Sequence, residues 1–250
     1  MIVVQRNNFH RAQFINASLS VRGVLTGTFG GLSEYLVLRQ TNQELYKENS
    51  LLRNQLDGLN KELDQSVSTS NDDIPGRLFS YIPAMVINNS TNKQYNFITL
   101  NKGRNHGIEE EMAVISPEGV VGVVYNVSSN YSTVIPLINR DFRLSAKILR
   151  NGYYGSMSWT GSDYRKSILE EIPFHVEILH GDTIVTSGYS AIFPEGIPVG
   201  RVLETEVLEG NFYTISVEIA VDYKKLSHVN IIHNLLREEQ LELERITGND

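Results

Sequence analysis

The sequence predicts a mainly β protein in which a long N-terminal coiled-coil helix precedes two small β-barrels. Three observations predict this fold class. Leucines recur every seven residues in the first part of the chain, and short β-rich runs then follow every ten or so residues, with turn residues between them. A Pro-Glu-Gly turn before a Val-rich strand also occurs twice. Apolar heptads are typical of coiled coils, and evenly spaced short strands are typical of barrels or sandwiches.

Composition limits the classes of function. The chain has 250 residues, of which 41% are hydrophobic and 20% charged, as in an ordinary globular protein. The formal net charge of −7 argues against nucleic acid as the principal partner, because such proteins concentrate Lys and Arg on one face. The absence of cysteine excludes disulfides, thiolate metal sites and cysteine nucleophiles. No run of eighteen apolar residues is present.

The predicted coiled coil spans residues 9–65. Its apolar stripe is confined to heptad positions a and d, whereas a helix packed on a domain shows a wider stripe. Asn42 and Asn49 occupy a positions, where each can pair with its own copy across a parallel two-stranded seam. Glycines within residues 23–31 either permit close helix approach or break the helix. The predicted homodimer seam consists of Tyr35, Leu38, Asn42, Leu45, Asn49, Leu52, Leu56, Leu59 and Leu63.

The remainder of the chain divides into a linker, two barrels and a tail. Residues 66–77 are a predicted linker, because a run of Ser, Thr, Asn and Asp ends there in Pro-Gly. We expect the first barrel at 78–163 and the second at 164–233, followed by a loose helix or disordered tail at 234–250. A strand at 81–88 could instead pair with the second barrel, which would make the domains discontinuous.

The stretch from Gly181 to Gly200 is the most constrained part of the sequence. Short strand-like pieces alternate there with Gly and Pro, which favour sharp corners because glycine supplies positive φ and proline fixes φ. The turn Pro117-Glu118-Gly119 echoes Pro194-Glu195-Gly196, which favours two barrels built on one plan. The predicted barrel-corner motif consists of Gly181, Asp182, Gly188, Phe193, Pro194, Gly196, Pro198 and Gly200.

Two barrels are also the frame of chymotrypsin-like serine proteases, so a β-barrel hydrolase is an alternative function. That chemistry needs a serine, a histidine and a buried carboxylate in mutual contact. Asp182 is followed by Thr183 instead of the Ser-Gly-Gly of a protease, and Ser187 is more simply a turn residue. The pair Glu170-Glu171 resembles a solvated turn, and the histidine spacings fit no metal motif. We therefore expect a double barrel without a triad: not an enzyme, and with no catalytic, cofactor or metal residues.

A second alternative is a membrane-fusion adaptor of a transporter. Such adaptors join β-barrels to a hairpin of two antiparallel coiled-coil helices. Only one heptad run is present here, which disfavours this alternative.

The order of coiled coil, linker and two barrels resembles the rod shape-determining protein MreC family, over residues 14 to 233. The Gly181–Gly200 stretch is the most specific part of the resemblance. Family members carry a transmembrane helix before the coiled coil, so Met1–Val4 would be its residual end and the chain a truncated form. Further segments similar to the family are Asn101-Lys102-Gly103, Gly107-Ile108, Met112-Ala113-Val114 and Gly119-Val120-Val121-Gly122.

The resemblance implies a non-enzymatic bacterial cell-shape scaffold. It would dimerise through the coiled coil, could polymerise through its barrels, and would organise the cell-wall elongation machinery. The implied partners are MreB, MreD and a class B penicillin-binding transpeptidase. The implied location is the inner membrane, crossed once by the missing helix, with this part periplasmic or extracytoplasmic. Tyr153, Tyr154, Tyr164 and Tyr189 are either aromatic interface anchors or ordinary strand residues.

Overall fold

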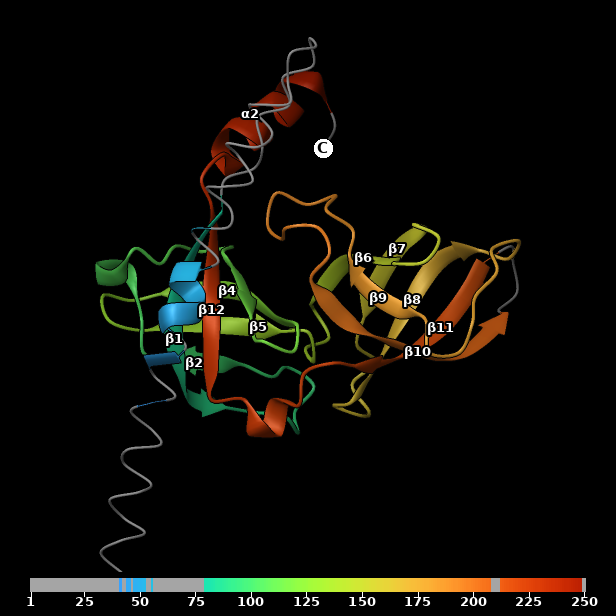
Figure 1. Cartoon of the computed structure of the whole chain (residues 1–250), viewed down its shortest axis with the longest axis horizontal. Helices are drawn as coiled ribbons and strands as arrows, with labels where there is room; N and C mark the ends of the chain where they lie inside the picture. Colours follow the sequence, from blue (N-terminus) through green and yellow to red (C-terminus); the bar gives the residue numbers. More distant parts are fainter. Residues whose placement is uncertain are drawn as a thin grey trace, which may run out of the picture. The chain divides into compact units, whose positions relative to one another are not determined.

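The computed structural model describes residues 41, 44–45, 47–52, 55, 79–207 and 212–248 (Figure 1). Residues 47–52 are helical. Most of the predicted coiled coil and the predicted linker at 66–77 lie outside the described residues, so the structure does not show a long helix. Within the described ranges, no helix is both long enough and apolar enough to cross a membrane.

The first barrel is closed by six antiparallel strands in the order β1-β12-β3-β4-β5-β2. In Figure 1, β12 is the red strand within an otherwise green barrel. It pairs with β1 on one side and with β3 on the other. The strands are β1 (Phe79–Asn89), β2 (Ile98–Leu100), β3 (Ala113–Ile115), β4 (Val120–Val127), β5 (Ser132–Pro136) and β12 (His228–Asn234).

The second barrel, yellow to orange in Figure 1, is closed by six strands in the order β10-β11-β8-β7-β6-β9. Its strands are β6 (Arg143–Ile148), β7 (Tyr154–Ser158), β8 (Lys166–Pro173), β9 (Thr183–Thr186), β10 (Pro198–Val207) and β11 (Phe212–Ile219). Two short 3-10 helices, η1 (Arg104–His106) and η2 (Tyr223–Lys225), lie between strands, and the α-helix α2 (Arg237–Thr247) follows β12.

The predicted barrel boundaries are wrong in two places. β6 and β7, which we expected in the first barrel at 78–163, belong to the second barrel. β12, which we expected in the second barrel at 164–233, closes the first. The strand predicted at 81–88 pairs within the first barrel, so its proposed pairing with the second is also wrong. The reason is that β12 fills the gap between β1 and β3, so the first barrel takes strands from both ends of the sequence.

β8 was not predicted from the sequence. Its buried residues Leu169 and Ile172 are three positions apart, because Glu171 adopts a φ of +70° and the pairing register with β11 shifts at this point. This β-bulge breaks the alternation of inward and outward residues on which strand prediction depends. Glu170 and Glu171, predicted as a solvated turn, therefore lie within a strand.

Alternate residues of the strands fill the two barrels. Ile98 and Leu100 of β2 point into the first core, whereas Thr99 between them is only partly buried. Ile215, Val217 and Ile219 of β11 show the same alternation in the second. Closing each sheet pairs every strand on both sides, which satisfies its backbone hydrogen bonds.

Candidate protein-interaction surface

The barrel-corner motif begins just before β9, includes the connection between β9 and β10, and ends within β10. Thr186, at the end of β9, forms several of the hydrogen bonds that hold the β9–β10 connection. Its Oγ1 donates to the Pro194 carbonyl at 2.6 Å and accepts from the Ile197 amide at 2.9 Å, while its own amide donates to the Ile197 carbonyl at 2.9 Å. Gly188 and Gly196 have φ values of +83° and +86°, which L-residues rarely adopt. These bonds and backbone conformations fold the connection back on itself.

Gly200 has a different role from the other motif glycines, because it lets two strands approach closely. A Cβ atom added there would lie 2.2 Å from the Glu218 carbonyl oxygen on β11. Gly122 has the equivalent role in the first barrel, where an added Cβ would lie 2.1 Å from the Ile135 carbonyl oxygen on β5. The strand sequences β3-β4-β5 and β9-β10-β11 are paired in the same order. The repeated glycine thus marks an equivalent position in each barrel.

The motif also contributes to an inter-barrel junction, which consists of Gly119, Val121, Ala191, Pro198 and Tyr223. A Cβ atom added at Gly119 would lie 2.2 Å from the Pro198 carbonyl oxygen. The buried Tyr223 hydroxyl donates to the Val121 carbonyl at 2.8 Å. The Asn234 amide group at the end of β12 donates to the Ala191 carbonyl at 2.9 Å. One side of the motif therefore packs directly against the first barrel.

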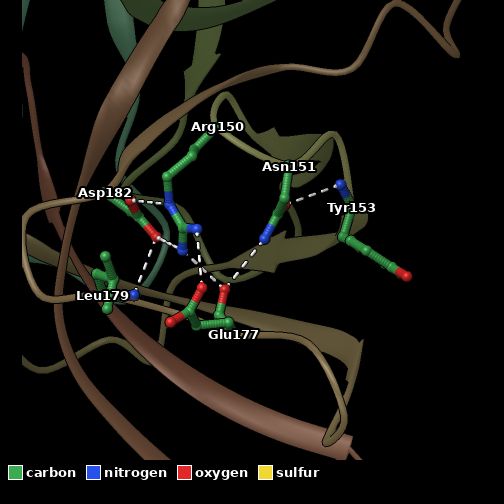
Figure 2. Close-up of polar contacts among 6 residues, drawn as sticks. All are labelled: Arg150, Asn151, Tyr153, Glu177, Leu179 and Asp182. Atoms are coloured by element: carbon green, nitrogen blue, oxygen red, sulfur yellow. Dashed lines mark hydrogen bonds and ion pairs between the residues drawn. The ribbon is translucent and has the colours of Figure 1, made fainter.

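Asp182 holds the other side of the motif through an ion pair with Arg150 (Figure 2). Arg150 Nε and Nη2 donate to the two carboxylate oxygens of Asp182, each at 3.0 Å. The Leu179 amide donates to the same carboxylate at 2.9 Å. These hydrogen bonds, above all those from Arg150, lower the pKa of the Asp182 carboxyl group below its usual value. Asp182 is therefore a partly buried structural anion at neutral pH.

Glu177 and Asn151 extend this contact across two loops. Arg150 Nη2 donates to the Glu177 carbonyl at 2.8 Å, and Asn151 Nδ2 donates to the same carbonyl at 3.1 Å. Asn151 Oδ1 in turn accepts from the Tyr153 amide at 3.2 Å. As Figure 2 shows, these bonds tie the β6–β7 turn to the β8–β9 loop. The position of Tyr153 is thereby fixed.

Aromatic side chains gather beside this polar cluster. These rings form two contacting groups, Tyr154 with Tyr189 and His175 with Tyr153 and Phe174, and we call the two groups together the aromatic face of the second barrel. The rings of Tyr154 and Tyr189 meet edge to face at 4.8 Å, although these side chains are 56% and 71% exposed. His175 lies 6.0 Å from Tyr153 and 6.2 Å from Phe174, in both cases edge to face. Large exposed aromatic groups on a rigid frame are typical of protein-binding surfaces.

Tyr164 is not part of this face. It is partly buried against the hydrophobic core, and the Lys224 ammonium lies 4.3 Å from its ring centre. The Tyr164 ring, which we considered as an interface anchor, therefore already makes a cation–π contact within the chain. Of the four tyrosines singled out in the sequence, the structure brings Tyr153, Tyr154 and Tyr189 to the aromatic face.

Ser187, the serine of the hydrolase alternative, is buried in the corner. Its hydroxyl donates to the Ser145 hydroxyl at 2.8 Å and accepts from the Tyr189 amide at 3.1 Å. Its partners are therefore a serine and a backbone amide, not a histidine base. Across the described ranges, no three His, Asp or Glu side chains gather as metal ligands would. The arrangement presents rings and hydrogen-bonding groups for binding.

A comparison with models of known protein families shows to which family the chain belongs. The model of "Rod shape-determining protein MreC, barrel core" matches residues 86–233, which span both barrels. The chain belongs to the MreC family. It is 28% identical over 207 residues to the cell shape-determining protein MreC of Listeria monocytogenes, covering 75% of this chain and 68% of that protein. It is 33% identical over 195 residues to the MreC of Haemophilus influenzae, covering 74% of this chain but 54% of that protein.

Solved MreC structures share the fold. The Listeria monocytogenes MreC structure aligns with a TM-score of 0.62 and 26% identity, over 79% of this chain and 94% of that one. The MreC chain of a complex between penicillin-binding protein PBP2 and MreC from Helicobacter pylori aligns with a TM-score of 0.53 and 22% identity, over 63% and 99%. The double barrel of this chain is therefore the MreC fold.

The structure describes three of the nine predicted seam residues. Leu45 and Leu52 are 48% and 47% exposed, and Asn49 is also exposed. Ser50, at a b position outside the seam, is buried, and its hydroxyl donates to the Asn230 side chain of β12. The other predicted seam residues lie outside the described ranges: Tyr35, Leu38, Asn42, Leu56, Leu59 and Leu63.

Sequence reasoning missed Arg150, Glu177, Phe174 and His175. Arg150 is 32 residues from Asp182, and no local pattern connects the two. Phe174 and His175 directly follow β8, the strand that its bulge concealed. A period-two search that tolerates one bulge would have found β8 and placed an aromatic pair at its exposed end.

Proposed function

We propose that this MreC-family chain is a non-enzymatic cell-shape scaffold that dimerises and organises the cell-wall elongation machinery on the outer face of the cytoplasmic membrane. The observation that carries the proposal is the family match over both barrels. The relatives are named cell shape-determining proteins, and the chain spans between 68% and 44% of the first three of them. MreB, MreD and further copies of this chain are proposed partners on the same ground.

A class B penicillin-binding transpeptidase is the partner that we propose for the aromatic face. An MreC from Helicobacter pylori forms a complex with PBP2, which makes a penicillin-binding protein the first partner to test. Binding energy at interfaces concentrates in a few aromatic anchors. The Arg150–Asp182 ion pair and Asn151 fix the loops beside these rings, so that little conformational entropy is lost when a partner binds.

Dimerisation through the heptad seam is supported by the described helical residues. Leu45, Asn49 and Leu52 lie at the predicted a and d positions and are exposed. The contact with the first barrel uses Ser50, which lies at a b position outside the seam. We propose a parallel homodimer joined by this seam.

Capture of the transpeptidase tests the aromatic face. A membrane-anchored, full-length form would be co-precipitated with a class B penicillin-binding protein from the same organism. Replacing Tyr154 and Tyr189 together by Ala is expected to weaken binding by about 2 kcal/mol or more, roughly thirtyfold. Tyr131→Ala, which removes an exposed tyrosine from the first barrel, is the matched control. Equal capture by the double variant and the control would place the interface elsewhere.

Light scattering tests the dimer. The wild-type chain is expected to have the mass of a dimer, and Leu45→Ala, Leu52→Ala and Leu59→Ala combined should yield monomers. Leu51→Ala, at a c position, is the control and should leave the dimer intact. Persistence of the dimer in the triple variant would count against the seam. Labelling of Ser187 by a serine-directed activity probe would contradict the non-enzymatic assignment.

A further inference from the structure

The β6–β7 turn contains the one Asn-Gly pair of the sequence, Asn151-Gly152. In such a pair the backbone nitrogen of the glycine can attack Cγ, the carbonyl carbon of the asparagine side chain. Glycine favours this attack because it has no Cβ atom to shield its own nitrogen. Asn151 is therefore the asparagine of this chain whose neighbour is best suited to react with it, and the fold determines whether the reaction occurs.

The reaction is a deamidation, and water is its only co-reactant. A bond forms between Asn151 Cγ and the Gly152 nitrogen, which loses its proton. The bond between Cγ and Nδ2 breaks, so that Nδ2 leaves as ammonia and a five-membered succinimide ring remains. Water then opens this ring at either of its two carbonyl groups. The product at position 151 is aspartate or isoaspartate.

The structure holds both reacting groups in hydrogen bonds that oppose this attack. Asn151 Nδ2 donates to the Glu177 carbonyl at 3.1 Å, and Asn151 Oδ1 accepts from the Tyr153 amide at 3.2 Å (Figure 2). The Gly152 amide donates to the Ile148 carbonyl at 2.8 Å. Departure of Nδ2 and loss of the Gly152 proton each break one of these bonds. The reaction therefore requires the turn to open first.

Arg150 closes this turn against the β8–β9 loop. Its Nη2 donates at 2.8 Å to the same Glu177 carbonyl that accepts from Asn151, and its Nη1 forms an ion pair with the Glu177 carboxylate at 3.3 Å. Gly152 is exposed and has open space beside it, so solvent reaches the turn as soon as these bonds break. The contact between Arg150 and Glu177 is therefore what keeps Asn151 unreactive.

We propose that Asn151-Gly152 is a deamidation site that the Arg150–Glu177 contact holds in check. An aspartate at position 151 has no amide hydrogen for the Glu177 carbonyl, and its negative charge would face that oxygen. Isoaspartate lengthens the backbone of the turn by one carbon atom. Both products release the turn that fixes Tyr153, so the modification would irreversibly loosen the aromatic face. The inference does not depend on a cell-shape role.

Peptide mapping by mass spectrometry on the full chain measures the conversion of Asn151 at mildly alkaline pH. Conversion in the folded protein is expected to be at least about tenfold slower than in the urea-unfolded chain, which corresponds to about 1.4 kcal/mol for opening the turn. Below the unfolding transition the rate should change little with urea, because local opening exposes little surface. Equal rates in the folded and unfolded chains, or no conversion of the unfolded chain, would overturn the proposal. A rate that rises in parallel with global unfolding would also overturn it.

Arg150→Ala tests what holds the turn closed. This variant, shown to be folded by circular dichroism, should convert Asn151 several-fold faster than the wild type. Arg165→Ala, which removes an ion pair with Asp222 outside the turn, is the matched control and should convert at the wild-type rate. Equal rates for the two variants would refute the role of Arg150. Asn151→Asp reproduces one product and should accelerate hydrogen exchange in residues 148–153, whereas unchanged exchange would contradict release of the turn.

Discussion

Tyr223 offers a direct test of the inter-barrel junction. It lies on η2, where the chain returns from β11 of the second barrel to β12 of the first. The side chain is fully buried in the hydrophobic core. Burial raises the pKa of the Tyr223 hydroxyl above its usual value, so the group remains protonated and donates to the Val121 carbonyl. Tyr223→Phe removes this hydrogen bond alone, and Tyr223→Ala also removes the ring.

The two substitutions are expected to differ several-fold in cost. The Val121 carbonyl keeps a second donor, the Leu137 amide at 2.9 Å, so Tyr223→Phe leaves no buried acceptor unsatisfied. We therefore expect Tyr223→Phe to cost about 0.5–1.5 kcal/mol, the usual net value of one hydrogen bond. Tyr223→Ala leaves a cavity in the core and should cost about 3–5 kcal/mol, as for other large aromatic residues. For a chain of this size, that corresponds to a fall in Tm of roughly 6–20 °C.

Urea and thermal unfolding, followed by circular dichroism, measure both costs. Tyr131→Ala, which truncates an exposed tyrosine of the first barrel, is the control and should change stability by less than about 0.5 kcal/mol. A cost below about 1 kcal/mol for Tyr223→Ala would refute the reasoning, because a ring packed in the core cannot be removed so cheaply. Equal costs for the Phe and Ala variants would likewise show that the ring packs less tightly than the structure indicates.

Two further predictions concern the barrel-corner motif. Gly200→Ala should lower the free energy of unfolding in urea by about 2–3 kcal/mol, because the new Cβ would meet the Glu218 backbone. Gly181→Ala should lower it by only about 1 kcal/mol, because that position has open space and only its φ of +84° is unfavourable. The reverse order of the two costs would contradict the close approach of the strands at Gly200. Asp182→Asn should destabilise the protein at neutral pH. The folded-state pKa of Asp182 is depressed, so the contribution of its carboxylate to stability is fully present above the usual value of 3.8 and is lost as the pH falls through the folded-state pKa. The urea midpoints of wild type and variant should therefore converge as the pH falls below 3.8. A difference that stays constant with pH would contradict the ion pair.

The sequence predicted the strands better than it predicted their partners. Short β-rich runs and turn residues predicted the strands of the hairpin β3–β4 and of the β9–β10 connection, where pairing is between sequence neighbours. β12 could not be assigned in this way, because its partners β1 and β3 lie more than a hundred residues earlier. Its residues are compatible with either barrel, and only closure of the sheet decides between them.

The candidate surface was predictable only in part. Asp182 and Tyr189 fall within the motif, and its dense Gly and Pro spacing drew attention to them. The function of Asp182 depends on Arg150, which lies in the β6–β7 turn and has no sequence signal of its own. Tyr164 is the opposite case. The sequence predicted it as a possible interface anchor, but in the structure its ring makes a cation–π contact with Lys224.

The geometry of the motif explains why so many of its positions are Gly or Pro. One short connection must turn back from β9 to β10, pack Pro198 against Gly119 of the first barrel, and present Tyr189 on the aromatic face. Asp182, just before β9, anchors the β6–β7 turn, which carries Tyr153 and leads into Tyr154 of β7. A substitution that loosens the corner should therefore weaken the junction and the binding surface together. For this reason Gly200→Ala is expected to reduce transpeptidase capture as well as stability, although Gly200 lies outside the aromatic face.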